Sequence, residues 1–419
     1  MGLRKKLFPL YYRLYKNRSV RDARERLILR IREAGRAKVL FIVSNLSMWR
    51  GQKLYEILSR DPRFEVCILL APFASFALSQ QAESMQALET FFRERDIPYY
   101  SATQLPRPGK FVRETLDPDI IFYPQQYRRL FRNGLDSERF DDKLLCFIPY
   151  ALVVFDQGWL YNQRFNNLAW RLYFPSDIHL ENARRRTVNK GANVRLVGDA
   201  TADMYREASR RDVWKKQKSS KKRVIWAPHF SIGEKGLLHR GSFLVLHQAM
   251  VDLSRKYQDR IQFAFKPHPR LLSELYAHPD WGKERADAYY RQWAQMPSAQ
   301  LETGAFADLF MGSDAMVHDC GSFTAEYFYT QNPVMFYTED RPGVEKQLNE
   351  LGLAALDAHY MGGSVAQLEQ FLEKVVLGGE DPMKEKREEV YRRYLLHPNG
   401  RSAAENIYCD LCRSLGWEA

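Results

Sequence analysis

The chain has 419 residues, of which 45% are hydrophobic and 13% are aromatic. This length and composition suit two or more globular domains with their own cores, and they exclude an intrinsically disordered protein. The formal charge of +12 predicts an anionic partner, which could be a phosphate compound, a nucleic acid or an acidic membrane surface. No apolar run reaches the roughly 20 residues that a membrane-spanning helix needs.

Residues 1–35 interleave Arg and Lys with Leu, Ile, Phe and Tyr, which predicts a basic amphipathic helical segment. Such a helix could lie on an anionic membrane face or pack on its own domain with a solvated basic side. We favour the membrane, because interleaved aromatic and basic side chains suit a lipid interface. The apolar part is too short and interrupted for a secretory signal. We therefore expect a cytoplasmic protein that is peripheral on the inner face of the cell membrane.

The five cysteines are odd in number and scattered, so they do not predict a disulfide framework. Cys409 and Cys412 form a C-x-x-C pair without a second pair nearby, and they fall in a helical pattern. We do not expect a zinc site.

Strand and helix patterns alternate over residues 36–205. Residues 38–43 are a continuous apolar run, which is typical of a central parallel strand. Residues 64–70 form the next predicted strand and residues 76–95 a long helix. Because further strands are predicted over 119–123 and 144–148, this region should be a Rossmann-like α/β domain.

A charged stretch at 206–223 contains few apolar residues and is predicted to be a linker. A second α/β alternation follows over 224–380, and helices over 381–419 should pack back across the domains. The expected fold class is α/β, with two Rossmann-like domains that face a central cleft.

Three strands of the second half are each followed by a polar cluster. The clusters are Pro228 to Ser231, Lys266-Pro267-His268-Pro269 and His318-Asp319-Cys320-Gly321-Ser322. Because ligands of open α/β sheets bind beyond the carboxyl ends of the strands, the three clusters should converge on one site.

The residue types in these clusters suit a pyrophosphate. Lys266 and His268 can both donate to phosphate oxygens, and the flanking prolines fix their backbone. Gly321 and Ser322 begin a predicted helix, whose first amides could bind an anion. The alternative is that Ser322 only caps that helix. His318, Asp319 and Cys320 are adjacent, so they point in different directions and cannot all bind one metal ion.

The common nucleotide and zinc motifs are not found in the sequence. Asp117-Pro118-Asp119 has the D-x-D form of metal-dependent transferases, but it precedes its strand, whereas a metal-holding pair should follow one. We interpret it as a turn.

The strand-end segments resemble those of the CDP-glycerol glycerophosphotransferase family, which includes teichoic-acid glycerol-phosphate primases and polymerases. Residues 266–269 meet the family's K-x-H-P in full, and residues 227–231 resemble its A-P-T-[FW]-R. Residues 318–326 match T-D-Y-S-S-x-x-x-[DE] at Asp319, Ser322 and Glu326. Residues 333–337 are similar to the next strand, P-[IV]-x-F-Y. The resemblance covers roughly residues 220–345.

This resemblance implies a GT-B-like fold and the transfer of an alditol phosphate from a CDP-alditol, most simply CDP-glycerol, with release of CMP. The implied acceptor is a hydroxyl of a lipid-linked glycan or a cell-surface polymer. Neither a cofactor nor a metal is part of the expectation. His268 is the expected catalytic residue, and the expected substrate-binding residues are His229, Ser231, Lys266, Asp319, Gly321, Ser322, Thr324 and Glu326.

The chain departs from the family at positions that concern the acceptor. Ser231 replaces the family's Arg, and His229 its Thr. The first-domain H-G-x-P-x-K, whose histidine is thought to act as the base, is closest to residues 155–159. Asp156 is then the candidate base, with His179 as the second candidate.

Two other functions fit part of the sequence. A GT-B glycosyltransferase that uses a nucleotide sugar for surface polysaccharide synthesis would share the architecture. A nucleic-acid-binding protein would need a basic stripe over one face. The basic residues concentrate instead in the N-terminal segment and the linker, so nucleic acid is not an expected partner.

Overall fold

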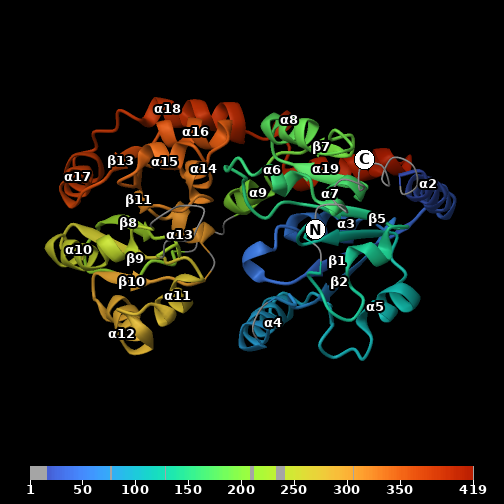
Figure 1. Cartoon of the computed structure of the whole chain (residues 1–419), viewed down its shortest axis with the longest axis horizontal. Helices are drawn as coiled ribbons and strands as arrows, with labels where there is room; N and C mark the ends of the chain where they lie inside the picture. The colour runs from blue at the N-terminus through green and yellow to red at the C-terminus, as the bar shows by residue number, and fades with distance from the viewer. Residues whose placement is uncertain are drawn as a thin grey trace. The chain divides into compact units, whose positions relative to one another are not determined.

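The structure is a computed structural model, and it describes residues 17–75, 78–127, 129–207, 212–232, 241–304 and 306–418. The chain divides into two compact units (Figure 1). Unit 1 is built from the chain up to Ala151, from Gln157–Asp203 and from His397 onward. Unit 2 is built from Leu152–Asp156 and Met204–Leu396.

Unit 1 contains a parallel seven-stranded sheet with the order β3-β2-β1-β4-β5-β6-β7. Its strand β1 (Ala37–Val43) is the predicted apolar run and is almost wholly buried, as a strand covered on both faces should be. The other strands are β2 (Phe64–Leu70), β3 (Tyr100–Ser101), β4 (Ile120–Tyr123), β5 (Leu144–Phe147), β6 (Arg171–Phe174) and β7 (Val194–Leu196).

The helices of unit 1 are α2 (Asn17–Ala34), α3 (Gln52–Arg60), α4 (Leu78–Arg93), α5 (Pro108–Phe111), α6 (Gly158–Tyr161), α7 (Arg164–Leu168), α8 (Asp177–Arg186) and α19 (Ala403–Leu415). Helix α9 (Ala200–Glu207) contains the point where the chain passes into unit 2. The strand–helix alternation confirms the predicted α/β fold of this region.

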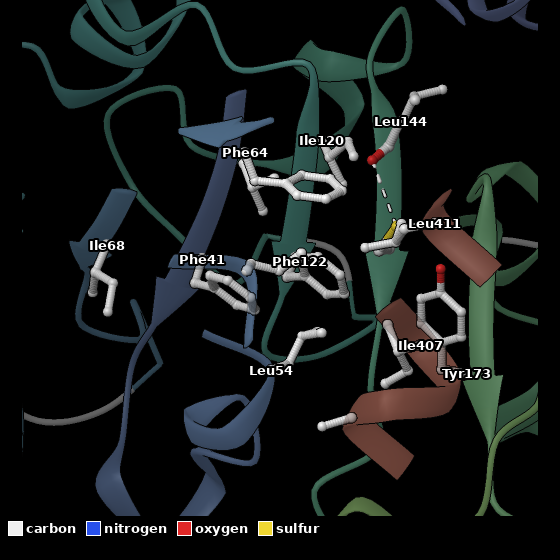
Figure 2. Close-up of a cluster of buried hydrophobic side chains, with 14 of the residues drawn as sticks. Phe41, Leu54, Phe64, Ile68, Ile120, Phe122, Leu144, Tyr173, Ile407 and Leu411 are labelled. Carbon is white, nitrogen blue, oxygen red and sulfur yellow. Dashed lines mark hydrogen bonds between the residues drawn. The ribbon is translucent and has the colours of Figure 1, made fainter. Parts of the chain in front are cut away.

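The C-terminal helix α19 belongs to the core of unit 1. Figure 2 shows Ile407 and Leu411 of this helix close to Tyr173 of β6, with Phe41 and Phe122 from the neighbouring strands in the same cluster. The rings of Phe41 and Phe122 stack with centroids 4.6 Å apart. Burying each large apolar side chain contributes about 1.5–3 kcal/mol, so α19 is a substantial part of this core.

The helix α2 packs on unit 1 rather than offering its apolar side to a membrane. Val20, Leu27 and Ile31 are buried, and the last two belong to the same core cluster. Arg30 forms an ion pair of 2.5 Å with Asp119. The apolar side of residues 17–34 is therefore covered by protein, and the sequence pattern did not distinguish this from burial in a membrane. Residues 1–16 lie outside the described ranges.

The Asp117-Pro118-Asp119 segment is a turn before β4, as predicted. Asp117 has a positive φ of 40° and accepts from Nζ of Lys143 at 2.5 Å, which lowers the pKa of its carboxyl group. Asp119 accepts from the backbone N–H of Lys38 at 2.8 Å. Both carboxylates thus have structural partners.

Unit 2 contains a parallel six-stranded sheet with the order β10-β9-β8-β11-β12-β13. The strands are β8 (Lys222–Ala227), β9 (Ile261–Phe265), β10 (Ala299–Leu301), β11 (Ala315–His318), β12 (Val334–Tyr337) and β13 (Tyr360–Gly362). The helices are α10 (Phe243–Lys256), α11 (Leu271–Ala277), α12 (Gly282–Gln295), α13 (Ala307–Met311), α14 (Phe323–Glu326), α15 (Arg341–Glu345), α16 (Glu350–Asp357), α17 (Val365–Gln370) and α18 (Lys384–Val390). The rings of Trp226, Phe265 and Trp293 pack together in its core, with centroids 4.9–5.7 Å apart.

The chain leaves unit 2 after Leu396, beyond the predicted limit at residue 380, and α18 belongs to unit 2. Part of the predicted linker is also structured, because Trp214 is buried and its indole N–H donates to the carbonyl of Leu309 at 3.2 Å. Among the described residues, no helix is both long and apolar enough to cross a membrane.

Candidate functional site

Three neighbouring strands of unit 2 end in the predicted polar clusters. β8 pairs in parallel with both β9 and β11, so their carboxyl ends meet at one edge of the sheet (Figure 1). Backbone bonds hold the segments together beyond that edge: the N–H of Lys266 donates to the carbonyl of Trp226 at 2.8 Å, and that of His268 to Pro228 at 3.0 Å. The predicted convergence of these segments is confirmed.

Asp319 ties the β11 end to the β8 end. Its side chain is buried, and one carboxylate oxygen accepts from the backbone N–H of His229 at 2.6 Å. The other accepts from the backbone N–H of Ser242, at the start of α10. Burial raises the pKa of Asp319, while these hydrogen bonds oppose the rise. Asp319 therefore positions the loop that carries His229.

Two histidines and a phenylalanine form the centre of the cluster. The rings of His229 and His268 lie 5.2 Å apart, and Phe230 lies 4.2 and 4.5 Å from them. Burial lowers the pKa of His229 to about 4 and that of His268 to about 3. Both rings are therefore neutral near pH 7.

Hydrogen bonds assign the tautomers of these rings. Nδ1 of His268 accepts from the backbone N–H of Arg270 at 3.1 Å, and Nδ1 of His229 accepts from the N–H of Ser231 at 3.3 Å. A neutral imidazole that accepts at Nδ1 carries its proton on Nε2. Each histidine can thus donate one hydrogen bond from Nε2 to an anion.

Lys266 is buried beside this pair. Its ammonium group donates to the carbonyl of Gly304 at 3.2 Å and lies 5.5 Å from the ring centre of Phe306. Burial lowers its pKa, and the carboxylates of Glu302 and Glu326 act against that effect. The lysine is thus a positive group held in a largely apolar setting.

The Gly321 turn differs from the predicted helix-start anion site. Gly321 is buried, and a Cβ at this position would lie 2.1 Å from a ring carbon of Phe155. The glycine therefore serves the close approach of this ring. Ser322 makes no capping hydrogen bond, and α14 spans only four residues, so its dipole is weak. Neither the cap nor an open cradle of amides describes this turn.

Thr324 and Glu326 lie inside unit 2. The hydroxyl of Thr324 donates to the carbonyl of Cys320 at 3.2 Å, and Glu326 accepts from the hydroxyl of Tyr205 at 3.0 Å. Both side chains are about 1–2% exposed. They support the turn from within, which corrects the expectation that they contact a substrate.

His318 is likewise a core residue. Its Nε2 lies 3.1 Å from Nε2 of His359, and burial holds the pKa of His318 well below its ordinary value.

The two candidate bases have different surroundings. Asp156 is exposed and follows Phe155, and its backbone N–H donates to the carbonyl of Gln347 at 2.8 Å within unit 2. His179 belongs to α8 of unit 1, where it is 1% exposed and lies 2.8 Å from the hydroxyl of Ser176. The exposed Asp156 is therefore better placed than His179 to meet an acceptor hydroxyl.

Arg270 was missed as a site residue, although it directly follows the K-P-H-P segment. Its guanidinium lies 4.1 Å from the ring centre of Phe230 and forms an ion pair of 2.6 Å with Glu274. Arg270 is exposed. Its guanidinium group adds a positive charge to a cluster whose histidines are neutral. The contact of Ser242 with Asp319 was also missed, because a backbone donor leaves no signal in the residue type.

The fold is similar to that of solved structures over nearly the whole chain. A structure of the wall teichoic acid polymerase TagF has a TM-score of 0.60 and 14% identity, with 99% of this chain and 98% of that chain covered. The UDP-GlcNAc 2-epimerase from Neisseria meningitidis, bound to UDP-GlcNAc, has a TM-score of 0.56 and 13% identity, with 90% and 100% covered. At these identities the likeness shows the fold, which confirms the predicted GT-B-like class.

The sequence comparison identifies the family. No curated protein matches the chain. The model of the CDP-glycerol:poly(glycerophosphate) glycerophosphotransferase family matches residues 198–411, just over half of the chain. This match does not favour the nucleotide-sugar glycosyltransferase alternative. The chain therefore belongs to the CDP-glycerol:poly(glycerophosphate) glycerophosphotransferase family, and it is a transferase with a CDP-glycerol donor.

Proposed function

We propose that the chain transfers glycerol phosphate from CDP-glycerol to a hydroxyl of a lipid-linked glycan or a growing polymer. The acceptor oxygen bonds to the phosphorus that carries glycerol, the bond from that phosphorus to the bridging oxygen breaks, and CMP leaves with this oxygen. The acceptor proton passes to a base. The observation that carries the proposal is the convergence of Lys266, His268 and His229 at one sheet edge, within the region that matches the family.

In this proposal the pyrophosphate lies beside the two histidines. His268 donates from Nε2 to the leaving phosphate, and the growing negative charge raises its pKa and strengthens that bond. His229, Ser231 and Ser322 contact the donor at its edge. Lys266 contributes charge, and Asp319 and Gly321 act by holding the loops in place.

Unit 2 is the donor domain of the proposal and unit 1 the acceptor domain. Asp156 is the base that takes the proton of the acceptor hydroxyl. An Asp156→Asn variant should lose turnover by about 100-fold, the usual contribution of a general base, while CDP-glycerol still binds. Unchanged turnover in this variant would exclude Asp156.

The proposed place of the reaction is the inner face of the cell membrane, where a lipid-linked acceptor would be found. The exposed arginines of α2, such as Arg18, Arg21 and Arg26, favour an anionic surface. Co-sedimentation with anionic vesicles, but not with neutral ones, is the expected result. Equal recovery with both kinds of vesicle would contradict it.

The activity test compares donors. The purified chain is incubated with CDP-glycerol or with UDP-GlcNAc, in each case with a glycerol phosphate oligomer as acceptor. Release of CMP with elongation of the oligomer is expected from CDP-glycerol, and no UDP is expected from the sugar nucleotide. Release of UDP together with sugar transfer would replace the proposal with a glycosyltransferase.

A further inference from the structure

Unit 1 contains a basic hollow of about 510 Å³ next to α5. Its lining includes Arg107, Lys110, Arg113 and Arg139, with Glu114 as the acidic member. One wall leads from the carboxyl end of β3 into α5, which Figure 1 labels. The other wall belongs to the segment that follows β4. We refer to this hollow as the α5 groove.

Close backbone packing builds the floor of the α5 groove. The N–H of Gly109 donates to the carbonyl of Asn133 at 3.0 Å, and a Cβ at Gly109 would lie 2.4 Å from the carbonyl oxygen of Gly134. Only glycine at 109 allows the two walls to meet in this way. The floor of the groove is therefore set by backbone packing.

The charges in the α5 groove are only partly compensated. Arg113 is paired with Asp142 at 2.7 Å, and Lys110 lies 3.4 Å from Glu114. Over the described part of the chain, no carboxylate lies within 4.0 Å of the guanidinium groups of Arg107 and Arg139, and both residues are exposed. Two guanidinium groups thus remain available to an anion.

The surroundings favour phosphodiesters over a nucleotide. Arginine donates two parallel hydrogen bonds to a phosphate, and two such groups on one hollow suit an anion with repeated phosphates. A base would need an exposed aromatic face. Phe140, the aromatic lining residue, is buried, and Arg113 lies over its ring at 4.9 Å. A concave site also fits a polymer better than it fits a flat lipid surface.

We propose that the α5 groove binds the phosphodiester backbone of the polymeric acceptor, through Arg107 and Arg139. The inference rests on the proposed function, because it assumes a poly(glycerol phosphate) acceptor. It assigns to unit 1 a binding site that lies outside the region of the family match. Residues 107 and 139 would act on acceptor affinity and not on the chemical step.

The test is direct binding of a synthetic glycerol phosphate oligomer to the full chain, followed by fluorescence anisotropy. An Arg107→Ala/Arg139→Ala variant should bind the oligomer at least about tenfold more weakly, since it loses charge-assisted hydrogen bonds to the phosphates. The loss should shrink as salt screens the charges. The matched control is Arg184→Ala/Arg185→Ala, which removes two exposed positive charges from α8 of the same unit. This control should keep wild-type affinity.

Kinetics separate this inference from the proposed function. With CDP-glycerol, the groove variant should raise KM for the oligomer and leave kcat within about twofold. Equal loss of affinity in the two variants would overturn the groove assignment, as would unchanged oligomer binding. Loss of binding to anionic vesicles alone would assign the groove to a membrane and also overturn it. Absence of CMP release in the wild-type chain would instead refute the proposed function, while the binding result would still stand.

Discussion

The sheet edge of unit 2 and the α5 groove of unit 1 present two different ways of handling a charged ligand. In unit 2 the groups are half-buried histidines and a buried lysine, fixed by backbone hydrogen bonds to Asp319 and to the neighbouring strand end. In unit 1 they are exposed arginines on a floor of packed glycines. A fixed and weakly hydrated set of donors suits the stabilisation of charge that develops in a reaction. Exposed guanidinium groups suit the binding of a polymer that must also be released.

The largest expected effect is at His268. If this residue is dispensable, the unit 2 sheet edge is not a site that stabilises the charge of a reaction. His268→Ala should lower turnover of CDP-glycerol by at least about 100-fold, because its Nε2 donor serves the leaving phosphate. The measurement is CMP release, with the thermal midpoint as the check on folding. His278→Ala, which changes a histidine outside the cluster, is the matched control. Near-wild-type turnover in His268→Ala would remove the cluster from the mechanism.

Gly321→Ala tests whether packing organises the unit 2 edge. Since the new Cβ would meet the ring of Phe155, unfolding should become easier by about 1–3 kcal/mol. Urea denaturation measures the change. The double variant Gly321→Ala/Phe155→Ala should show less than the sum of the two single losses. Additive losses would mean that the Cβ introduced at position 321 does not contact the ring of Phe155.

Arg270→Ala examines the one exposed cation of the unit 2 cluster described above. We expect KM for CDP-glycerol to rise about tenfold with little change in kcat, as for the loss of one charge-assisted contact. Arg255→Ala, an exposed change on α10, should leave KM as it is. A fall in kcat alone would mean that Arg270 acts on the chemical step.

The pH dependence of stability separates the histidines from the arginines. The folded-state pKa is about 4 for His229 and for His359 and about 3 for His268, each below the ordinary value of 6.5. Between its folded-state pKa and 6.5, each histidine therefore binds more protons in the unfolded chain than in the folded one. The contribution of the neutral histidines to the free energy of unfolding is complete above pH 6.5 and is lost as the pH falls towards 4. At pH 5.5 we expect a loss of roughly 1 kcal/mol per histidine in urea denaturation. The His359→Gln variant should have a shallower dependence, and an equally steep one would contradict the assignment.

The sequence predicted the fold and the strand ends because their signals are local. Largely apolar runs such as 38–43 and 261–265 became β1 and β9, and Lys266 to Pro269 lies directly beyond a strand. The strands β3, β6, β10 and β13 were not predicted, and three of them have only two or three residues, which carry little pattern.

The errors concern contacts between distant parts of the chain. The contact of Phe155 with Gly321 joins two segments that share no sequence signal. Because of this contact, the turn that was predicted to bind a phosphate is packed against an aromatic ring. The amphipathic pattern of α2 indicated one apolar side but could not say whether protein or lipid would cover it. The burial of His179 was equally invisible in its residue type.

The return of α19 to unit 1 has a consequence for synthesis on the ribosome. Every residue of unit 2 is made before His397, so unit 2 can complete its core while unit 1 still lacks a helix. Unit 1 must wait for α19, whose first amides at Ala403 and Ala404 are bound by Asp203 at 3.1 and 3.0 Å. A nascent chain arrested before α19 would thus expose the apolar face seen in Figure 2.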